Sequence, residues 1–207
     1  MNQKCFDICQ DSIATSEARK DAPAIDIYTA GTCKSKAALG GWGVLIFEGD
    51  GEPRPLFGGE AAVSTNCMEL TAVIVALEDL EGPRAVALYS SSDYLRKGII
   101  RAKARGWKTK TGECVKHLDL WLRLDAAASR HDMAWVWLGV DSGNAMNARA
   151  HTLAYRGLSV AKKAAKKSAA KERARQVRAA KRRARAAAVK AIAVQMTASG
   201  SLAVALT

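Results

Sequence analysis

The sequence lacks the features that target a chain to a membrane or across one. No window of the 207 residues approaches 18 consecutive apolar residues, so no membrane-spanning helix is expected. The N-terminus has no continuous apolar segment of the kind found in secretory signals. It also carries four acidic residues, which transit peptides avoid: Asp7, Asp11, Glu17 and Asp21. We therefore expect a cytoplasmic protein without a membrane partner.

Cysteines are few, odd in number, and without the spacing of a metal finger. The five are Cys5, Cys9, Cys33, Cys67 and Cys114. An odd and scattered set predicts reduced thiols, as in a cytoplasmic protein, in place of a disulfide framework. Cys5 and Cys9 could form a metal-binding pair, but isolated thiols are the simpler interpretation.

Acidic residues are almost absent from one segment near the C-terminus. Residues 161–190 hold 13 of the 32 Lys and Arg but only one of the 20 Asp and Glu. The formal net charge of +12 therefore belongs to this segment, and the rest of the chain carries equal numbers of each sign. We expect residues 160–207 to form a cationic arm that contacts phosphates, and the candidate contacts are Lys162, Lys163, Lys166, Lys167, Arg182 and Arg183.

The arm also lacks glycine, proline and a broad apolar stripe. No Gly or Pro occurs between Val160 and Ser199, and Ala, Lys and Arg are strong helix formers. With so few large apolar residues, such a helix is marginally stable alone, so the arm is predicted to be helical or disordered. A solubilising extension without a partner and an arm for acidic protein partners stay open as alternatives. A membrane-surface helix is disfavoured, because aromatic and leucine anchors are missing before Leu202.

The remaining sequence predicts a weakly structured leader, residues 1–24, followed by one α/β domain, residues 25–159. Short apolar or alternating runs predict strands over 25–29, 42–47, 55–59, 85–89 and 133–138. Helical periodicity predicts helices over 66–80, 93–100, 118–125 and 144–158. The basic stretch 101–110 is too polar and glycine-broken for a core, whereas Trp121, Trp135 and Trp137 are interpreted as core residues. This order of elements predicts a mixed five-stranded sheet with flanking helices.

Several strings in the domain resemble bacterial-type (type 1) ribonuclease H. They are Thr29–Cys33, Gly40–Gly43, Thr65–Leu70, Arg105–Thr109, Asp119–Trp121, Arg123–Ala127 and Trp135–Trp137, and the resemblance runs from about Ile25 to Gly157. It implies a ribonuclease H-like fold and hydrolysis of the RNA strand of RNA–DNA hybrids. It further implies a site where clustered carboxylates hold two divalent metal ions.

Of the four carboxylate positions that the resemblance implies, this sequence keeps only Glu69. The other three fall on Ala30, Ser91 and His151, and a loop histidine that assists turnover in the family falls near Asp141. Alanine offers no ligand atom, serine is a weak neutral ligand, and histidine prefers transition metals to Mg²⁺. We therefore expect a degenerate catalytic centre with no resident cofactor.

An enzyme with a rearranged centre stays open as an alternative. Glu69, Asp93, Asp141 and His151 are the candidate ligands of a shifted metal site, which would require Mg²⁺ or Mn²⁺ for residual ribonuclease H cleavage.

The substrate-contacting face implied by the resemblance is partly retained. Asn66 and Glu69 match positions that touch the hybrid, and Thr65 replaces a second asparagine of the family. Lys36 stands where the family has a polar base-contacting residue. The family's basic protrusion is shortened but stays positive through Lys103, Arg105, Lys108 and Lys110. For any single one of these lysines a solvated surface position is an equal alternative. The leading interpretation is an inactive ribonuclease H-like protein that binds RNA or an RNA–DNA hybrid, within a larger nucleoprotein particle.

Overall fold

The computed structural model describes residues 25–34, 38–49, 51–139 and 142–204. The chain divides into two compact units, with the boundary between Lys162 and Lys163. Our division into a leader (1–24), a domain (25–159) and an arm (160–207) stays a prediction, and the leader lies outside the described residues.

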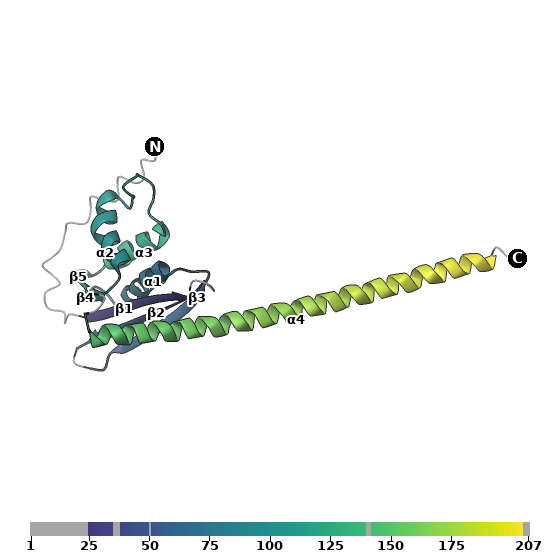
Figure 1. The fold of residues 1–207 in the computed structure, drawn as a ribbon, viewed down its shortest axis with the longest axis horizontal. Helices are drawn as coiled ribbons and strands as arrows, with labels where there is room; N and C mark the ends of the chain where they lie inside the picture. Colours follow the sequence, from purple (N-terminus) through teal and green to yellow (C-terminus); the bar gives the residue numbers. More distant parts are fainter. Residues whose placement is uncertain (1–24, 35–37, 50, 140–141, 205–207) are drawn as a thin grey trace. The chain divides into compact units, whose positions relative to one another are not determined.

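A mixed five-stranded sheet, as predicted, forms the centre of the first unit (Figure 1). The strand order is β3-β2-β1-β4-β5, with antiparallel pairing of β1 to β2 and of β2 to β3. β4 pairs in parallel with both β1 and β5. The strands are β1 (Ile25–Lys34), β2 (Leu39–Glu48), β3 (Arg54–Ala61), β4 (Ala85–Ser90) and β5 (Asp132–Trp137).

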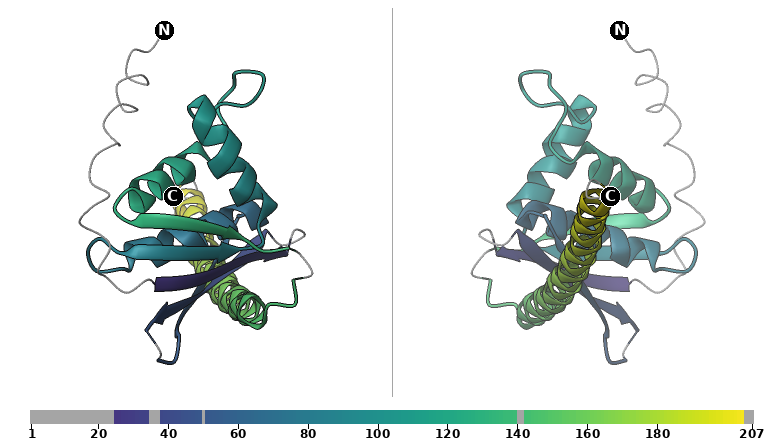
Figure 2. Two further views of the ribbon diagram at one scale, coloured as in Figure 1. Left: turned by 90° about the vertical axis from the view of Figure 1, so that its left-hand side faces the viewer. Right: turned by 90° about the vertical axis from the view of Figure 1, so that its right-hand side faces the viewer.

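Four α-helices accompany the sheet in the described part of the chain: α1 (Thr65–Glu78), α2 (Asp93–Lys97), α3 (Leu118–Ala128) and α4 (Ala145–Val204). α1 begins after Ser64, whose Oγ accepts a hydrogen bond from the Cys67 amide, as an N-cap residue does. The predicted apolar face of this helix is confirmed, because Leu70, Val73 and Ile74 are fully buried. Figure 2 shows α1, α2 and α3 gathered on one side of the sheet.

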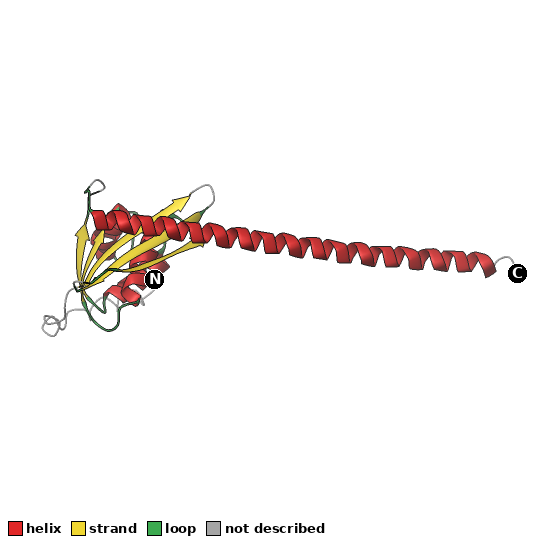
Figure 3. Cartoon of the chain, turned by 90° about the horizontal axis from the view of Figure 1, so that it is seen from below, coloured by secondary structure: helices red, strands yellow, loops and turns green. Residues whose placement is uncertain are grey.

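β1 separates two layers of packing because successive side chains of a strand point to opposite faces. Ile25 and Ile27 join the main core, to which α1 and α3 contribute. Ala30 on the opposite face joins a second cluster with Ala150 and Ala154 of α4. The first turns of α4 therefore cover the face of the sheet opposite α1, as Figure 3 shows.

α4 approaches the sheet so closely that no side chain fits between them. A β-carbon on Gly43 would lie 2.4 Å from the Ala150 carbonyl oxygen. One on Gly157 would lie 2.0 Å from the Gly58 carbonyl oxygen. Glycine is therefore needed at these positions for the helix to pack directly on the backbone of β2 and β3.

Several elements differ from their predicted bounds, among them β1 and α2. β1 was expected to end at Thr29, but it continues to Lys34 because residues 31–34 pair with residues 39–42 of β2. The helix expected over 93–100 is α-helical only to Lys97. A π-helical turn (Gly98–Ala102) and a 3₁₀ turn (Lys103–Arg105) follow it. Gly98 packs against Trp121, whose ring would lie 2.1 Å from a β-carbon at this position.

The basic stretch 101–110 contributes to the core, so the prediction that it was too polar was wrong at two positions. Ala102 and Trp107 are buried, and the Trp107 ring stacks on Trp121 with 5.2 Å between centroids. Lys103 and Arg105, which lie between them, are exposed. Trp135 and Trp137 are half-buried, pack against the core and stack on each other.

The last helix was expected over residues 144–158, but α4 continues to Val204. Of the two forms predicted for the arm, the structure therefore shows the helical one. None of the described helices is both long enough and apolar enough to cross a bilayer.

Candidate functional site

A small cavity lies where the parallel pairing of β1 and β4 ends. The last paired residues are Thr29 and Ser90, after which β1 continues along β2 and the chain after β4 turns into α2. Ligands of open α/β sheets bind at such carboxyl ends of parallel strands. The cavity has a volume of about 10 Å³ and is hereafter called the Glu69 cavity; its lining is Thr29, Ala30, Gly31, Glu69, Ser90, Ser91, Ser92 and His151.

The structure brings together the four positions at which the sequence comparison expected catalytic carboxylates. Ala30 comes from β1, Glu69 from α1, Ser91 from the segment after β4, and His151 from α4. Only Glu69 is acidic. Their correspondence to catalytic positions stays a prediction, but they are neighbours around one cavity.

Glu69 is held by a hydrogen bond that the sequence did not predict. The Ser92 hydroxyl donates to Glu69 Oε2 at 2.5 Å. Ser92 Oγ also accepts a hydrogen bond from the Leu95 amide at 3.1 Å, as the N-cap residue of α2. Burial raises the pKa of Glu69 above its ordinary value, and the Ser92 hydrogen bond opposes that rise in part. The carboxylate is therefore positioned but poorly solvated.

Two further polar groups in the cavity carry no charge. Burial lowers the pKa of His151, so the neutral imidazole is favoured at neutral pH. The Thr29 hydroxyl is buried and has no hydrogen-bond partner among the described residues. Apart from Glu69, the lining of the cavity is thus neutral.

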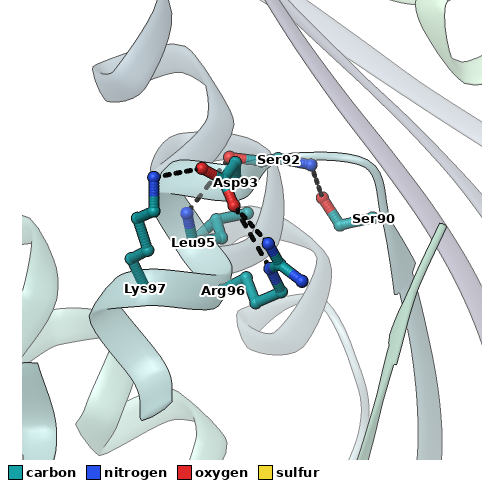
Figure 4. A network of polar contacts seen from close by, with 6 residues as sticks. All are labelled: Ser90, Ser92, Asp93, Leu95, Arg96 and Lys97. Atoms are coloured by element: carbon teal, nitrogen blue, oxygen red, sulfur yellow. Dashed lines mark hydrogen bonds and ion pairs between the residues drawn. The ribbon is translucent and has the colours of Figure 1, made fainter. Parts of the chain in front are cut away.

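Asp93, a candidate ligand of a shifted metal site, does not line the Glu69 cavity. Its carboxylate accepts hydrogen bonds from Arg96 at 2.7 and 3.2 Å and pairs with Lys97, as Figure 4 shows. Lys97 and Arg96 together lower the pKa of Asp93. The structure therefore brings Glu69 and His151 together without Asp93, and Asp141 lies outside the described residues.

The predicted nucleic-acid contacts within the described residues lie in α1, in the segment between α2 and α3, and in the arm. Thr65 and Asn66 lie in the first turn of α1, one turn before Glu69. Arg105, Lys108 and Lys110 are exposed in the segment between α2 and α3. Lys103 there forms an ion pair with Asp125. Lys36 lies outside the described residues.

The arm presents its cations to solvent. The candidate contacts Lys162, Lys163, Lys166, Lys167, Arg182 and Arg183 are all exposed. None of them pairs with a carboxylate among the described residues.

Comparison with known proteins places the domain in a family. A family model described as RNase H matches residues 22–159. The chain belongs to the RNase H family. Its match to ribonuclease HI of Caulobacter vibrioides is 48% identical over 143 residues, covering 67% of this chain and 95% of the relative. A ribonuclease H of Alcanivorax borkumensis is 47% identical over 140 residues, covering 66% of this chain and 92% of the relative.

A solved RNase H structure supports the same conclusion. The crystal structure of LC9-RNase H1, described as a type 1 RNase H with the type 2 active-site motif, superposes with a TM-score of 0.57. The two sequences are 28% identical, and the match covers 67% of this chain and 73% of that one. The ribonuclease H-like fold predicted from the sequence is thereby confirmed.

The donor set of the Glu69 cavity does not fit the pair of Mg²⁺ ions that RNase H resemblance implies. Mg²⁺ requires hard oxygen ligands in near-octahedral geometry, and two ions carry four positive charges. The cavity offers one carboxylate, and its Oε2 already accepts the Ser92 hydroxyl. Among the described residues, no group of three or more His, Cys, Asp or Glu side chains is arranged to hold a metal ion.

Two features of this RNase H domain escaped sequence reasoning. Ser92 could have been identified as an N-cap from its place before Asp93 and a short helix, but not as the partner of Glu69. The contact between Cys67 and His117 joins residues 50 positions apart, for which the sequence carries no local signal.

Proposed function

We propose that this RNase H family member binds RNA or RNA–DNA hybrid without cleaving it and uses its cationic arm for phosphate contacts. The observation that carries the proposal is the composition of the Glu69 cavity. One carboxylate stands where the sequence comparison expects four, and Ala30, Ser91 and His151 supply no further negative charge.

Having one carboxylate in place of four changes the electrostatics of the cavity in two ways. Glu69 alone cannot balance two divalent ions, so metal-assisted activation of water lacks its ligands. A cavity with a single carboxylate also repels a phosphate group much less than one with four, because like charges about 4 Å apart repel by about 4 kcal/mol per pair near a protein surface. The same replacements thus disfavour cutting and favour metal-free contact with a nucleic-acid backbone.

Repulsion between the basic side chains of the arm favours a polyanionic partner. Six pairs of basic residues stand four positions apart between residues 162 and 185, and an example is Lys162 with Lys166. Like-charge pairs at this spacing destabilise a helix by roughly 0.2–0.5 kcal/mol each. Phosphates lying along the helix would remove this repulsion, whereas no described acidic side chain does.

Cleavage is tested with a labelled RNA–DNA hybrid in Mg²⁺ and, separately, in Mn²⁺. We expect binding without cutting. A purified wild-type protein whose cleavage disappears in the Glu69→Gln variant would refute the non-catalytic proposal, because contaminating nuclease would not depend on Glu69.

The arm is tested in the full chain by replacing its six candidate contacts with glutamine. Binding to a hybrid is measured between 50 and 200 mM salt. If each contact neutralises one phosphate, the slope of log K against log salt should become shallower by about 5. A control in which the four lysines of the set, Lys162, Lys163, Lys166 and Lys167, become arginine keeps the charge and should keep the slope. An unchanged slope in the glutamine variant would exclude the arm from phosphate binding. If added polyglutamate failed to compete with the hybrid for the protein, an acidic protein partner would be disfavoured.

A further inference from the structure

The basic residues of the arm form a regular row along one face of its helix. From residue 163 to residue 185 they follow one another at intervals of four, four, four, three, four and three positions. Residues three or four positions apart are neighbours on the surface of an α-helix. The row is hereafter called the basic stripe, and its members are Lys163, Lys167, Lys171, Arg175, Arg178, Arg182 and Arg185.

The basic stripe runs straight along α4 and is exposed. An α-helix turns by about 100° per residue, which places all seven side chains within about 120° of its circumference. With a rise of about 1.5 Å per residue, the stripe is about 33 Å long. Every member is exposed, and none forms an ion pair with a carboxylate among the described residues. The stripe therefore presents about one positive charge to solvent at each turn of the helix.

The opposite face of the arm carries fewer cations, at irregular intervals. They stand four, seven, ten and seven positions apart, and the acidic Glu172 lies among them. These residues are Lys162, Lys166, Arg173, Arg183 and Lys190. The remaining basic residue, Lys181, lies at the edge of the stripe. A phosphate backbone that follows the stripe meets a cation at every turn, whereas on the opposite face most cations are two or three turns apart.

The straightness of the basic stripe favours a single strand over a duplex. One turn of a duplex spans about 34–36 Å, which is close to the length of the stripe. Over that distance each strand winds once around the duplex axis, so a straight row of cations faces the same strand over only part of its length. A single strand is not held to this path and can follow all seven cations.

The arm has no side chain suited to stacking on bases. No Phe, Trp or Tyr follows Tyr155 in the sequence. Proteins that recognise unpaired bases stack them on aromatic side chains. Contacts of the arm would therefore be made to phosphates, which carry no sequence information.

We propose that the basic stripe follows one phosphate backbone and binds single-stranded RNA or DNA, without preference for base sequence. This inference rests on the proposed function and narrows it, because it assigns phosphate contact to one face of the arm. Three of the six candidate contacts belong to the stripe: Lys163, Lys167 and Arg182. A bound strand would also neutralise the repulsion between neighbours along the stripe, each of which has a like charge three or four positions away.

The test compares two variants of the full chain that lose the same charge from different faces. The stripe variant carries Lys171→Gln and Arg185→Gln, and the control variant carries Arg173→Gln and Lys190→Gln. Each loses one lysine and one arginine, and glutamine is a good helix former. Binding is measured between about 50 and 200 mM salt with oligouridylate, oligothymidylate and a blunt RNA–DNA hybrid.

On both single strands the stripe variant should flatten the slope of log K against log salt by about 1.4, because each lost contact contributes about 0.7. The control variant should keep the slope of the parent protein. On the blunt hybrid each contact contributes about 0.9, and we expect the stripe variant to change the slope by less than about 0.9.

Equal changes of slope in the two variants would overturn the proposal, because they would show that phosphates contact the arm on all sides. A change of about 1.8 on the hybrid would also overturn it, since both positions would then contact a duplex. A parent protein that binds the hybrid but neither single strand would refute the stripe assignment and leave the proposed function standing. Hybrid cleavage that depends on Glu69, together with the expected slopes, would refute the proposed function and support the stripe assignment.

Discussion

Placing aspartate at the three neutral positions around Glu69 should make the stability of the domain depend on Mg²⁺. The variant carries Ala30→Asp, Ser91→Asp and His151→Asp, so that four acids surround the Glu69 cavity. Without metal, carboxylates about 4 Å apart at an effective dielectric constant of 20 repel by about 4 kcal/mol per pair, so the variant should be less stable than its parent.

Metal binding should reverse this loss by mass action. A ligand that binds only the folded state stabilises it by about 2.7 kcal/mol at a concentration 100 times its Kd. For a chain of this size each kcal/mol shifts Tm by roughly 2–4 °C, which gives a rise of about 5–10 °C. The parent protein should shift by less than about 1 °C, because Glu69 alone makes a poor site.

The assay is thermal unfolding at increasing Mg²⁺, followed by incubation with a labelled RNA–DNA hybrid. A matched variant with asparagine at the same three positions has similar volume without charge and should show no Mg²⁺-dependent rise. If the parent gains as much stability as the aspartate variant, the Glu69 cavity already holds the metal and our reasoning is wrong. Mg²⁺-dependent cleavage by the aspartate variant would show that the substrate face is intact.

Two further outcomes follow from packing and burial. Gly157→Ala should destabilise the domain by about 1–3 kcal/mol or more in urea unfolding, since its β-carbon would lie 2.0 Å from the Gly58 carbonyl oxygen. Gly139→Ala, whose β-carbon meets nothing within 4 Å, is the control and should be within about 0.5 kcal/mol of the parent. Burial raises the pKa of Glu69 in the folded state above the ordinary value of 4.5, which applies to the unfolded chain. Ionisation of Glu69 therefore lowers the free energy of unfolding as the pH rises from 4.5 through the folded-state pKa. Glu69→Gln should therefore gain more stability over the parent at pH 7.5 than at pH 4, and an equal difference at both would contradict that cause.

Local pattern was enough to predict most of the sheet and its helices. The spacing of Leu70, Val73 and Ile74 fixes one buried face of α1 whatever its partner is. It was not enough for Trp107, because its burial depends on stacking against Trp121 of α3. The end of β1 was missed for a related reason, since pairing with β2 carries the strand past Gly31.

The site shows the same division between local and distant information. The resemblance of motifs assigned Ala30, Glu69, Ser91 and His151 to one site, and the structure gathers them around one cavity. The hydrogen bond from Ser92 to Glu69 and the approach of His117 to Cys67 depend on how helices pack across the core. Hydrophobic periodicity carries no information about such pairs.

The continuity of α4 has a consequence for how the arm becomes helical. Starting a helix in water is unfavourable by a factor of about 10³, or roughly 4 kcal/mol, whereas extending one is nearly neutral for residues such as alanine. α4 begins at Ala145, where buried residues such as Ala150 and Ala154 hold its first turns on the sheet. The folded domain therefore supplies a nucleus from which the arm propagates, and nucleic acid would need only to extend a helix already begun.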